Sequence, residues 1–196
     1  MGLRNPFRRK GDSEKMRALT ISSQIAAFVT LLFFIACMPP TNKFSSVWKD
    51  ETYQERPKKV LVISAFKFPA NRKLFEDDFV EVLKDRGIDA VVSYNVMPNP
   101  VVNDQDAIAH QAYAVGADAV LVNSPLDDQD ELDISGGILF GESYLHSRTY
   151  VYDMKTNRMV FGATSESWIQ KNKPYTDQIK SYVRELSKVM SKNRLI

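Results

Sequence analysis

The sequence has few of the residues from which small proteins build cross-links and catalytic sites. It contains one cysteine, Cys37, and two histidines, His110 and His146. A single cysteine excludes an internal disulfide, and two histidines make a zinc site only if carboxylates complete it. The glycine-rich dinucleotide fingerprint, the P-loop and the nucleophile-elbow motif are all absent. We therefore expect a protein that is not an enzyme and that has no cofactor.

The composition suits one globular domain, and the charge is unevenly distributed. Of the 196 residues, 44% are hydrophobic and 26% are charged, which is typical of one packed domain. The formal net charge is +2, but residues 1–36 carry six basic and two acidic residues, so residues 37–196 are weakly acidic. A weakly acidic domain lacks the clustered positive field that phosphate backbones require, so we expect no nucleic-acid partner.

An uncharged segment near the amino terminus indicates export. Residues 18–36 carry no charge, the eleven residues 26–36 form their most apolar part, and basic residues precede them. This arrangement is typical of a signal peptide. The segment is also close to the roughly 20 apolar residues of a membrane-spanning helix, so an uncleaved anchor is an alternative. A cytosolic protein with an apolar amino end is a further alternative.

The end of this segment, Phe34-Ile35-Ala36-Cys37, resembles the lipobox of bacterial lipoproteins, although phenylalanine replaces the usual leucine three residues before the cysteine. The resemblance implies cleavage after Ala36 and lipidation of Cys37. Because each buried CH₂ contributes about 0.8 kcal/mol, more than one acyl chain gives a stable membrane anchor. In lipoprotein sorting, a residue other than aspartate after the cysteine, here Met38, implies the outer membrane, with the domain facing the periplasm.

The sequence predicts three segments. A signal peptide covers residues 1–36, the lipidated cysteine and a polar, proline-containing tether cover 37–57, and one α/β domain covers 58–192. About twenty extended tether residues, at about 3.1 Å each, could hold the domain up to roughly 60 Å from the bilayer. Because Trp48 and Tyr53 lie within the tether, we expect part of it to pack on the domain.

The apolar pattern of the domain predicts alternating strands and helices, followed by a hairpin and a last helix. Continuous apolar runs indicate buried strands, and apolar residues at i, i+4 and i+7 indicate one face of a helix. The expected fold is α/β, with a two-layer or three-layer mixed sheet in the order βαβαβ-ββ-α and Asn71 as the first helix's N-cap. The expected strands are 60–63, 90–94, 119–122, 144–152 and 158–168, and the expected helices lie around 74–83, 108–115 and 174–190.

This element order, on a chain with a lipoprotein signal, resembles the amino-terminal domain of TolB and the outer-membrane lipoproteins that activate peptidoglycan synthases. The hairpin segment 150–161 is similar to a strand–Tyr-Asp–Lys-Thr–strand stretch that is common in uncharacterised envelope lipoproteins. The resemblance covers roughly residues 58–190. It implies a mixed sheet backed by helices, a role in docking other proteins, and no catalytic residue.

Two groups of acidic residues are candidates for chemistry. Residues 76–78 are all acidic, but successive helical residues point about 100° apart, so their carboxylates do not converge and we expect a solvated face. Within the acidic segment 127–133, Asp128, Asp130 and Asp133 offer the carboxylate oxygens that Ca²⁺ prefers. Because the spacing departs from that of an EF-hand, a solvated loop is the simpler interpretation and a metal site the weaker one.

Aromatic residues gather in the predicted hairpin. In an alternating register, Tyr144, Tyr150 and Tyr152 share one face of the strand, opposite Val151. Core packing is the simpler interpretation of these side chains. If helices cover only one face of the sheet, the three tyrosines instead form an aromatic strip for partner binding.

These observations favour a lipid-anchored envelope protein whose domain is a non-catalytic module that docks other envelope proteins. A second hypothesis is a module that binds a small ligand or a divalent metal through the acidic segment 127–133. A third is an enzyme that groups His110 or His146 with carboxylates in a pocket that the sequence does not reveal. The identity of the partner and the oligomeric state stay open.

Overall fold

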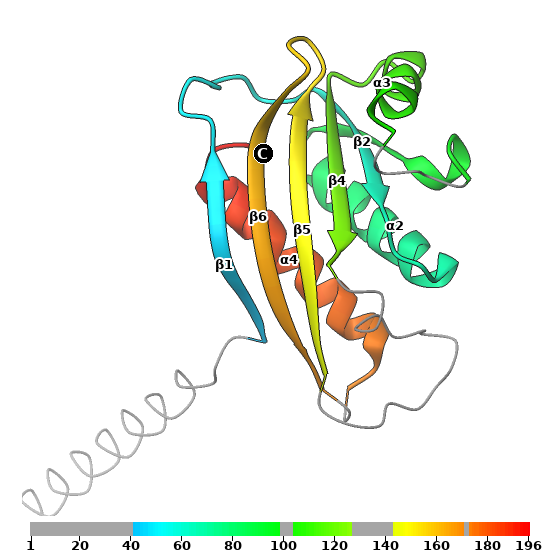
Figure 1. Cartoon of the computed structure of the whole chain (residues 1–196), viewed down its shortest axis with the longest axis vertical. Coiled ribbons are helices and arrows are strands. Elements are labelled where there is room, and N and C mark those ends of the chain that lie inside the picture. Colours follow the sequence, from blue (N-terminus) through cyan, green and yellow to red (C-terminus); the bar gives the residue numbers. More distant parts are fainter. Residues whose placement is uncertain (1–40, 99–103, 127–142, 171–172) are drawn as a thin grey trace, which may run out of the picture. The chain divides into compact units, whose positions relative to one another are not determined.

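The domain is built on one mixed sheet (Figure 1). The structure, a computed structural model, describes residues 41–98, 104–126, 143–170 and 173–196, and within these ranges the sheet has six strands. The elements in chain order are β1 (Asn42–Lys49), β2 (Lys59–Ser64), α2 (Pro69–Asp85), β3 (Asp89–Val92), the short 3₁₀ helix η1 (Ser93–Asn95), α3 (Gln105–Ala114), β4 (Ala119–Pro125), β5 (Ser143–Asp153), β6 (Arg158–Ile169) and α4 (Tyr175–Lys192).

The sheet has a parallel half and an antiparallel half. Its strand order is β1-β6-β5-β4-β2-β3. Strand β2 pairs in parallel with β3 and β4, and these three strands form the parallel half. Strands β5, β6 and β1 form the antiparallel half, which joins the parallel half where β5 pairs with β4. The α/β class and the mixed sheet predicted from the sequence are confirmed.

The parallel half is buried on both faces. In β2, Val60 and Val62 pack in a core with the helices α2 and α4, whereas Leu61 and Ile63 pack in a second core with α3. Strand residues alternate between the two faces, so a continuous apolar run is what a strand covered on both sides requires. Gly87 follows α2 at φ 75°, a left-handed conformation that glycine adopts without strain.

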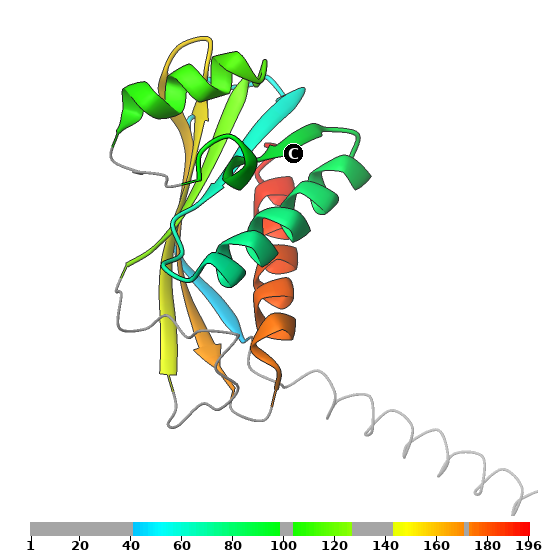
Figure 2. The ribbon, with the colours of Figure 1, turned by 90° about the vertical axis from the view of Figure 1, so that its right-hand side faces the viewer.

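Within the described residues, helices cover only one face of the antiparallel half. Helix α4 packs its apolar residues, such as Val183 and Leu186, into the core that also contains Phe161 and Ala163 of β6. Helix α3 lies on the opposite side of the sheet from α2 and α4, beside the parallel half (Figure 2). The domain therefore has three layers over the parallel half and two over the antiparallel half, which reconciles the two arrangements expected from the sequence.

The hairpin predicted from the sequence is confirmed. Strands β5 and β6 are joined by a turn in which Asn157 takes a left-handed φ of 54°. The Asp153 carboxylate accepts hydrogen bonds from the backbone N–H of Thr156, at 2.9 Å, and from its hydroxyl, at 2.6 Å. Aspartate and asparagine at a turn stabilise it through such local contacts and tolerate left-handed angles.

Strand β1 is a correction to the sequence analysis. The predicted tether 37–57 contains Asn42–Lys49, which pairs antiparallel with β6 along its length. The tether prediction is thus wrong for this strand, and the expectation that part of the segment packs on the domain is confirmed. A bulge between Phe44 and Ser46 interrupts the alternation of apolar and polar residues that identifies a strand. The predicted signal peptide, 1–36, lies outside the described residues.

The start of α2 also differs from the expectation. The helix begins at Pro69 with Phe68 as its N-cap, and Asn71 is buried inside the helix rather than capping it. Proline is favoured at the first helical position because its missing N–H would have no intrahelical partner there.

Among the described residues, no helix combines the length and the apolar character needed to cross a bilayer.

Candidate functional site

Several predicted site residues lie outside the described residues. These are the lipidation candidate Cys37 and the metal candidates Asp128, Asp130 and Asp133, so both proposals stay predictions. Within the part of the chain that the structure describes, no cluster of three or more histidine, cysteine, aspartate or glutamate side chains is placed to hold a metal ion.

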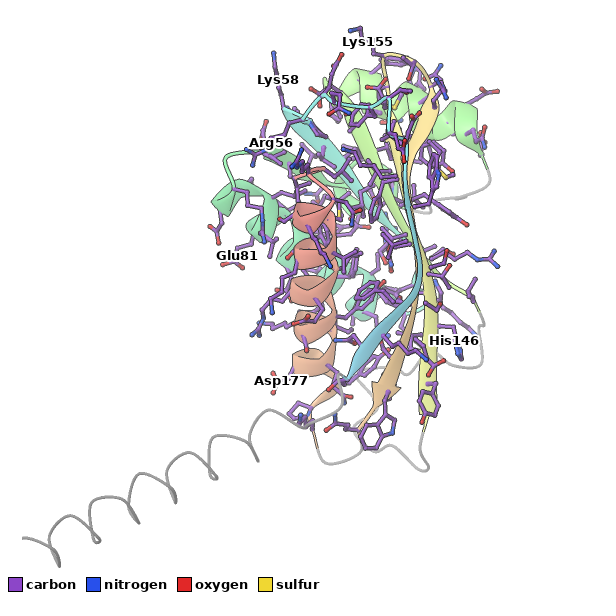
Figure 3. The ribbon with its side chains drawn as sticks, turned by 90° about the vertical axis from the view of Figure 1, so that its left-hand side faces the viewer. Arg56, Lys58, Glu81, His146, Lys155 and Asp177 are labelled. Atoms are coloured by element: carbon purple, nitrogen blue, oxygen red, sulfur yellow. The ribbon has the colours of Figure 1, made fainter. Side chains whose placement is uncertain are left out.

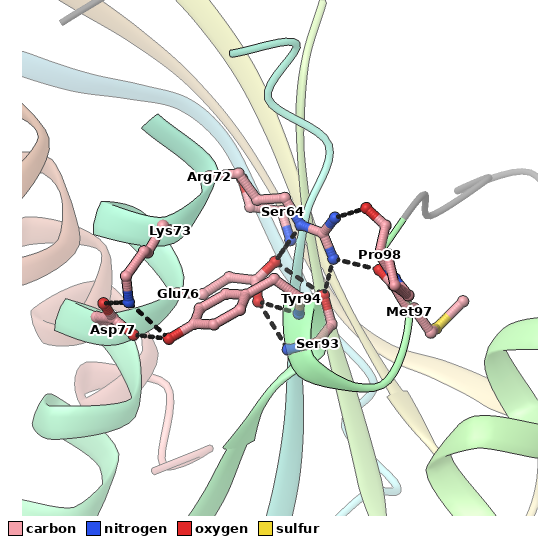
Figure 4. A network of polar contacts seen from close by, with 9 residues as sticks. All are labelled: Ser64, Arg72, Lys73, Glu76, Asp77, Ser93, Tyr94, Met97 and Pro98. Carbon is pink, nitrogen blue, oxygen red and sulfur yellow. Dashed lines mark hydrogen bonds and ion pairs between the residues drawn. The ribbon is translucent and has the colours of Figure 1, made fainter. Parts of the chain in front are cut away.

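Two buried charged side chains, Arg72 and Glu76, form an ion pair on α2 (Figure 4). The Glu76 carboxylate is fully buried and accepts hydrogen bonds from the Arg72 Nε at 2.9 Å and from the Ser93 hydroxyl at 2.8 Å. It also accepts from the backbone N–H groups of Ser64, Ser93 and Tyr94, at 3.0, 2.6 and 3.0 Å. The prediction of a solvated face is therefore wrong for Glu76.

The guanidinium of Arg72 is equally well satisfied. It donates to the backbone carbonyls of Met97 and Pro98, both at 2.7 Å, and to the Ser93 hydroxyl at 2.8 Å. Every polar group of the pair thus has partners within the fold, and the pair ties α2 to the carboxyl ends of β2 and β3. A buried charge pair that is fully hydrogen-bonded within the protein fixes the local geometry of the fold. It has no free donor or acceptor with which to bind a substrate.

The next residue along α2, Asp77, faces solvent as predicted. Its carboxylate accepts from the Lys73 ammonium at 2.7 Å and from the Tyr94 hydroxyl at 2.6 Å, and Lys73 also donates to the Tyr94 hydroxyl at 2.8 Å. These hydrogen bonds to Asp77 and Tyr94 raise the pKa of Lys73 above its ordinary value. The group is a surface ion pair over an aromatic ring, a motif of modest effect on stability.

The two histidines occupy different elements. His110 is exposed on α3, whereas His146 lies on β5 opposite Glu166 of β6, with 3.6 Å between the Nε2 and Oε2 atoms. The side chains of His146 and Glu166 are both partly exposed, so solvent screens their interaction.

The three predicted tyrosines do share one face, and that face is the one that α4 leaves uncovered. We call it the open face: the side of β1, β6 and β5 that carries Trp48, Tyr144, Arg148, Tyr150, Tyr152, Glu166 and Trp168. From Phe161 to Ile169, the side chains of β6 alternate between buried positions under α4 and partly or fully exposed positions on the open face. The register thus produces the aromatic strip that the sequence left as an alternative to core packing.

The exposure of the tyrosines differs along the strip. Tyr144 is 44% exposed, whereas Tyr150 and Tyr152 are half-buried, with ring centroids 6.4 Å apart. Burial raises the pKa of the Tyr152 phenol. Core packing thus describes Tyr152 in part, because it also contacts the core beneath α3, and does not describe Tyr144.

Between α3 and the hairpin, the open face contains a pocket of about 510 Å³. Ile108 of α3 and Val122 of β4 contribute apolar surface, and Tyr150 and Tyr152 of β5 also line the pocket. Arg148, also in the lining, is exposed, and its guanidinium makes no hydrogen bond or ion pair with any residue that the structure describes. Polar side chains line the pocket as well, among them Asp106, Ser124 and Asn157, so it combines apolar surface with hydrogen-bonding groups, as recognition sites commonly do.

Across the antiparallel half, one row of residues extends this pocket to the sheet edge. Trp48 of β1 pairs with Gly162 of β6, which in turn pairs with Tyr150 of β5. Because Gly162 has no side chain, the Tyr150 ring lies directly over it, 3.5 Å from where a Cβ would stand. Trp48 is 46% exposed. Exposed aromatic side chains around a pocket are typical of protein–protein interfaces.

The opposite face of the same strands is closed by a polar layer beneath α4. The Tyr182 hydroxyl lies 3.1 Å from both the Asn123 amide and the Ser165 hydroxyl, which donate to it, and 3.4 Å from the Thr149 hydroxyl. Burial raises the pKa of Tyr182, and these hydrogen bonds lower it in part. The layer is enclosed by α4, so it contributes to structure rather than to recognition.

No family model matches the chain, and no curated protein matches its sequence. Among solved structures, the chain is similar to the PelC dodecamer from Paraburkholderia phytofirmans, with a TM-score of 0.52, 14% identity, and coverage of 79% of this chain and 99% of that one. It also matches lipoprotein GNA1162 from Neisseria meningitidis, at TM-score 0.44 and 12% identity over 69% of this chain and 97% of that one. At these identities the likeness to PelC shows a shared fold, and the weaker match carries no argument. The resemblance to TolB is not tested and stays a prediction.

Proposed function

We propose that the chain is a lipid-anchored cell-envelope protein whose domain is a non-catalytic assembly module, and that it docks its partner through the open face. The observation that carries the proposal is the aromatic face of the antiparallel half, which no described helix covers, with the adjacent pocket and the Arg148 guanidinium, which has no ion pair among the described residues. The anchor is the lipidated Cys37 expected from the lipobox, with the outer membrane as the expected site.

The chemistry of the open face favours a protein partner. Trp48 and Tyr150 offer large aromatic surfaces at a small cost in conformational entropy, and arginine joins them as the residues most often found at binding hot spots. Because Arg148 has no ion pair among the described residues, a partner that presents a carboxylate beside an apolar side chain would satisfy both groups.

Further copies of this chain are the partner that we propose first. The similar PelC structure is a dodecamer, so the same fold does associate with itself. Beside Arg148, the open face carries Glu166 and, on β1, Lys43, so it presents both signs of charge. A surface with both signs is able to pair with a second copy without like-charge repulsion.

Photo-crosslinking of the full-length protein in its native membranes tests this proposal. A photoreactive amino acid at position 150 is expected to give an adduct of twice the protomer mass, and Arg148→Glu is expected to reduce its yield. Position 81 on α2 is the matched control, because Glu81 is exposed and points away from the sheet (Figure 3). An adduct with a different protein would replace the self-assembly proposal, and no adduct at positions 48, 148 and 150 would contradict docking by the open face.

Intact-mass analysis of the membrane-extracted protein tests the anchor separately. We expect a chain that begins at Cys37 and carries the added mass of its acyl groups. A protein that retains Met1, or whose cysteine is unmodified, would contradict lipid anchoring. A Cys37→Ser variant is expected to leave the membrane fraction only if the signal peptide is still removed, so its amino terminus is determined in the same experiment.

A further inference from the structure

Because Asn42–Lys49 is a strand of the sheet, the tether after Cys37 is three residues long instead of about twenty. Residues 38–40 separate Cys37 from Thr41, and β1 begins at Asn42. Four consecutive Cα–Cα steps, at 3.3–3.6 Å of chain extension each, span at most about 14 Å. A lipidated Cys37 would therefore hold Thr41, the residue just before β1, within about 14 Å of the headgroup level, instead of the roughly 60 Å that a long tether allows.

An exposed aromatic pair lies at the end of the sheet where the chain enters β1. Tyr144 at the start of β5 pairs directly with Trp168 at the end of β6, and the two side chains are 44% and 37% exposed. The backbone N–H of Trp168 donates to the carbonyl of Thr41 at 2.9 Å. The pair is thus held by a backbone hydrogen bond to a residue four positions from the acylated cysteine.

We propose that Tyr144 and Trp168 contact the interfacial region of the bilayer and orient the domain upright on the membrane. The inference rests on the proposed lipidation of Cys37. Tryptophan and tyrosine combine an apolar ring with a hydrogen-bonding group, which is why they concentrate at the boundary between headgroups and acyl chains. The acylated Cys37 with its short tether is one attachment point, and the aromatic pair is a second. Two attachment points fix the orientation of the domain on the membrane, whereas a single anchor does not.

The charged side chains described near Tyr144 and Trp168 do not account for a membrane contact. We therefore attribute the contact to the two aromatic side chains. Lys43 of β1 lies opposite Glu166 of β6, and Glu166 also faces His146. Asp177, at the start of α4, lies toward the same end of the domain as His146, whereas Lys58 and Lys155 lie toward the other (Figure 3). Since both signs of charge occur there, attraction to anionic lipids is weak, and the contact is expected to be insensitive to salt.

The sequence contains two tryptophans, and the second serves as an internal control. Trp48 is 46% exposed on the same open face, but it lies near the far end of β1 and pairs with Gly162. At about 3.3 Å per strand residue, it is about 20 Å farther from the chain entry than Trp168. A contact made by the membrane-facing end of an upright domain would reach Trp168 and leave Trp48 in the aqueous layer.

Quenching of tryptophan fluorescence by brominated lipids tests the proposal. The full chain, processed and acylated, is reconstituted in phosphatidylcholine vesicles whose acyl chains are brominated close to the headgroup. Trp48→Phe leaves Trp168 as the only tryptophan, which is excited selectively over the tyrosines, and its emission is expected to fall on the order of twofold relative to unbrominated vesicles. Trp168→Phe leaves Trp48, whose emission is expected to stay unchanged. Unaltered thermal unfolding in detergent shows that both variants are folded.

The outcomes separate this inference from the proposed function. Equal quenching of the two variants, or quenching of Trp48 alone, would overturn the proposed orientation. An acylated protein that floats with the vesicles but shows no quenching of Trp168 would overturn the aromatic contact and leave the lipid anchor intact. A protein without acyl mass would overturn both. Self-assembly through the open face would shield both tryptophans from water without bringing either one to the brominated acyl chains, so it does not imitate selective quenching of Trp168.

Discussion

The parallel and antiparallel halves of the sheet use their side chains in opposite ways. Both faces of β2 and β4 are buried, and the ends of β2 and β3 are fastened to α2 through the Arg72–Glu76 pair. In the antiparallel half, the face under α4 is buried, while the open face keeps aromatic rings partly in water. The comparison indicates that the parallel half supplies stability and that the antiparallel half supplies surface.

The largest expected effect is at Glu76. Its replacement in Glu76→Ala leaves the Arg72 charge buried without its counter-ion, which costs about 3–5 kcal/mol of unfolding free energy. Urea denaturation measures the loss. Glu81→Ala, on the exposed side of the same helix, is the control and is expected to change stability by no more than about 0.5 kcal/mol. Equal losses in the two variants would contradict a fastening role for the buried pair.

A double variant sharpens this prediction. Arg72→Met with Glu76→Leu removes both charges, a change that is often nearly neutral for buried ion pairs. Here the backbone N–H groups of Ser64, Ser93 and Tyr94 would still lose their acceptor. At about 1–3 kcal/mol for each unsatisfied group, the double variant is expected to stay at least about 3 kcal/mol less stable than the native protein. Full recovery would show that the charges alone matter.

The second prediction compares the two faces of the antiparallel half. Phe161→Ala opens a cavity beneath α4, where Phe161 is fully buried, and is expected to cost about 3–5 kcal/mol. Trp48→Ala removes a larger side chain from the open face and is expected to cost about 1 kcal/mol or less. Chemical denaturation of both variants checks the difference. A large loss for Trp48→Ala would mean that the open face is part of the core.

The third prediction concerns the polar layer under α4 and pH. Burial raises the folded-state pKa of Tyr182 above its ordinary value of 10.0, so the folded protein holds this proton more tightly than the unfolded chain. This contribution is complete below pH 10 and declines as the pH rises above it. Burial also raises the pKa of Tyr53 to about 12, with the same sign.

Denaturation at pH 8 and at pH 11 measures this linkage. The native protein is expected to be less stable at the higher pH. Tyr182→Phe removes hydrogen bonds to Asn123 and Ser165 and is expected to cost about 1–3 kcal/mol at pH 8, with a smaller further loss at pH 11. Tyr53→Phe separates the second contribution. An unchanged pH dependence in both variants would assign the alkaline loss to other groups.

The smallest expected effect is at Gly162, where the open face approaches its own backbone. A Cβ at this position would lie 3.5 Å from the Tyr150 ring, an ordinary contact distance. Because glycine inside a strand costs roughly 0.5–1 kcal/mol relative to alanine, Gly162→Ala is expected to raise stability by up to that amount. A thermal unfolding curve shows the direction. A clear destabilisation would mean that Tyr150 must lie flat on the glycine.

The sequence predicted those elements whose burial follows a regular period. Strand β2 was predicted because four consecutive apolar residues fit a strand buried on both faces, and the hairpin because alternating runs flank an Asp–Asn turn. The shared face of Tyr144, Tyr150 and Tyr152 followed from the same alternation. Whether that face is open depends on where α3 packs, which no local pattern records.

The errors have a common cause, because each depends on neighbours that are distant in sequence. Strand β1 is polar and bulged, and its pairing with β6 joins residues more than a hundred positions apart. The three consecutive acids 76–78 predict a solvated face for Glu76, although the sequence also shows its i, i+4 relation to Arg72. The three backbone N–H groups that make its burial favourable come from β2 and η1, so only the folded chain reveals them.

The pairing of β1 has a mechanical consequence. A pull on the chain ahead of Asn42 along the strand axis loads the pairing of β1 with β6 lengthwise, because β1 begins at Asn42 and runs antiparallel to β6. A force in this direction shears the hydrogen bonds of the ladder together instead of opening them one after another. The hydrogen bonds between β1 and β6 would thus share a force that pulls on the domain. A ladder loaded in this way resists separation far better than one whose hydrogen bonds open in sequence from one end.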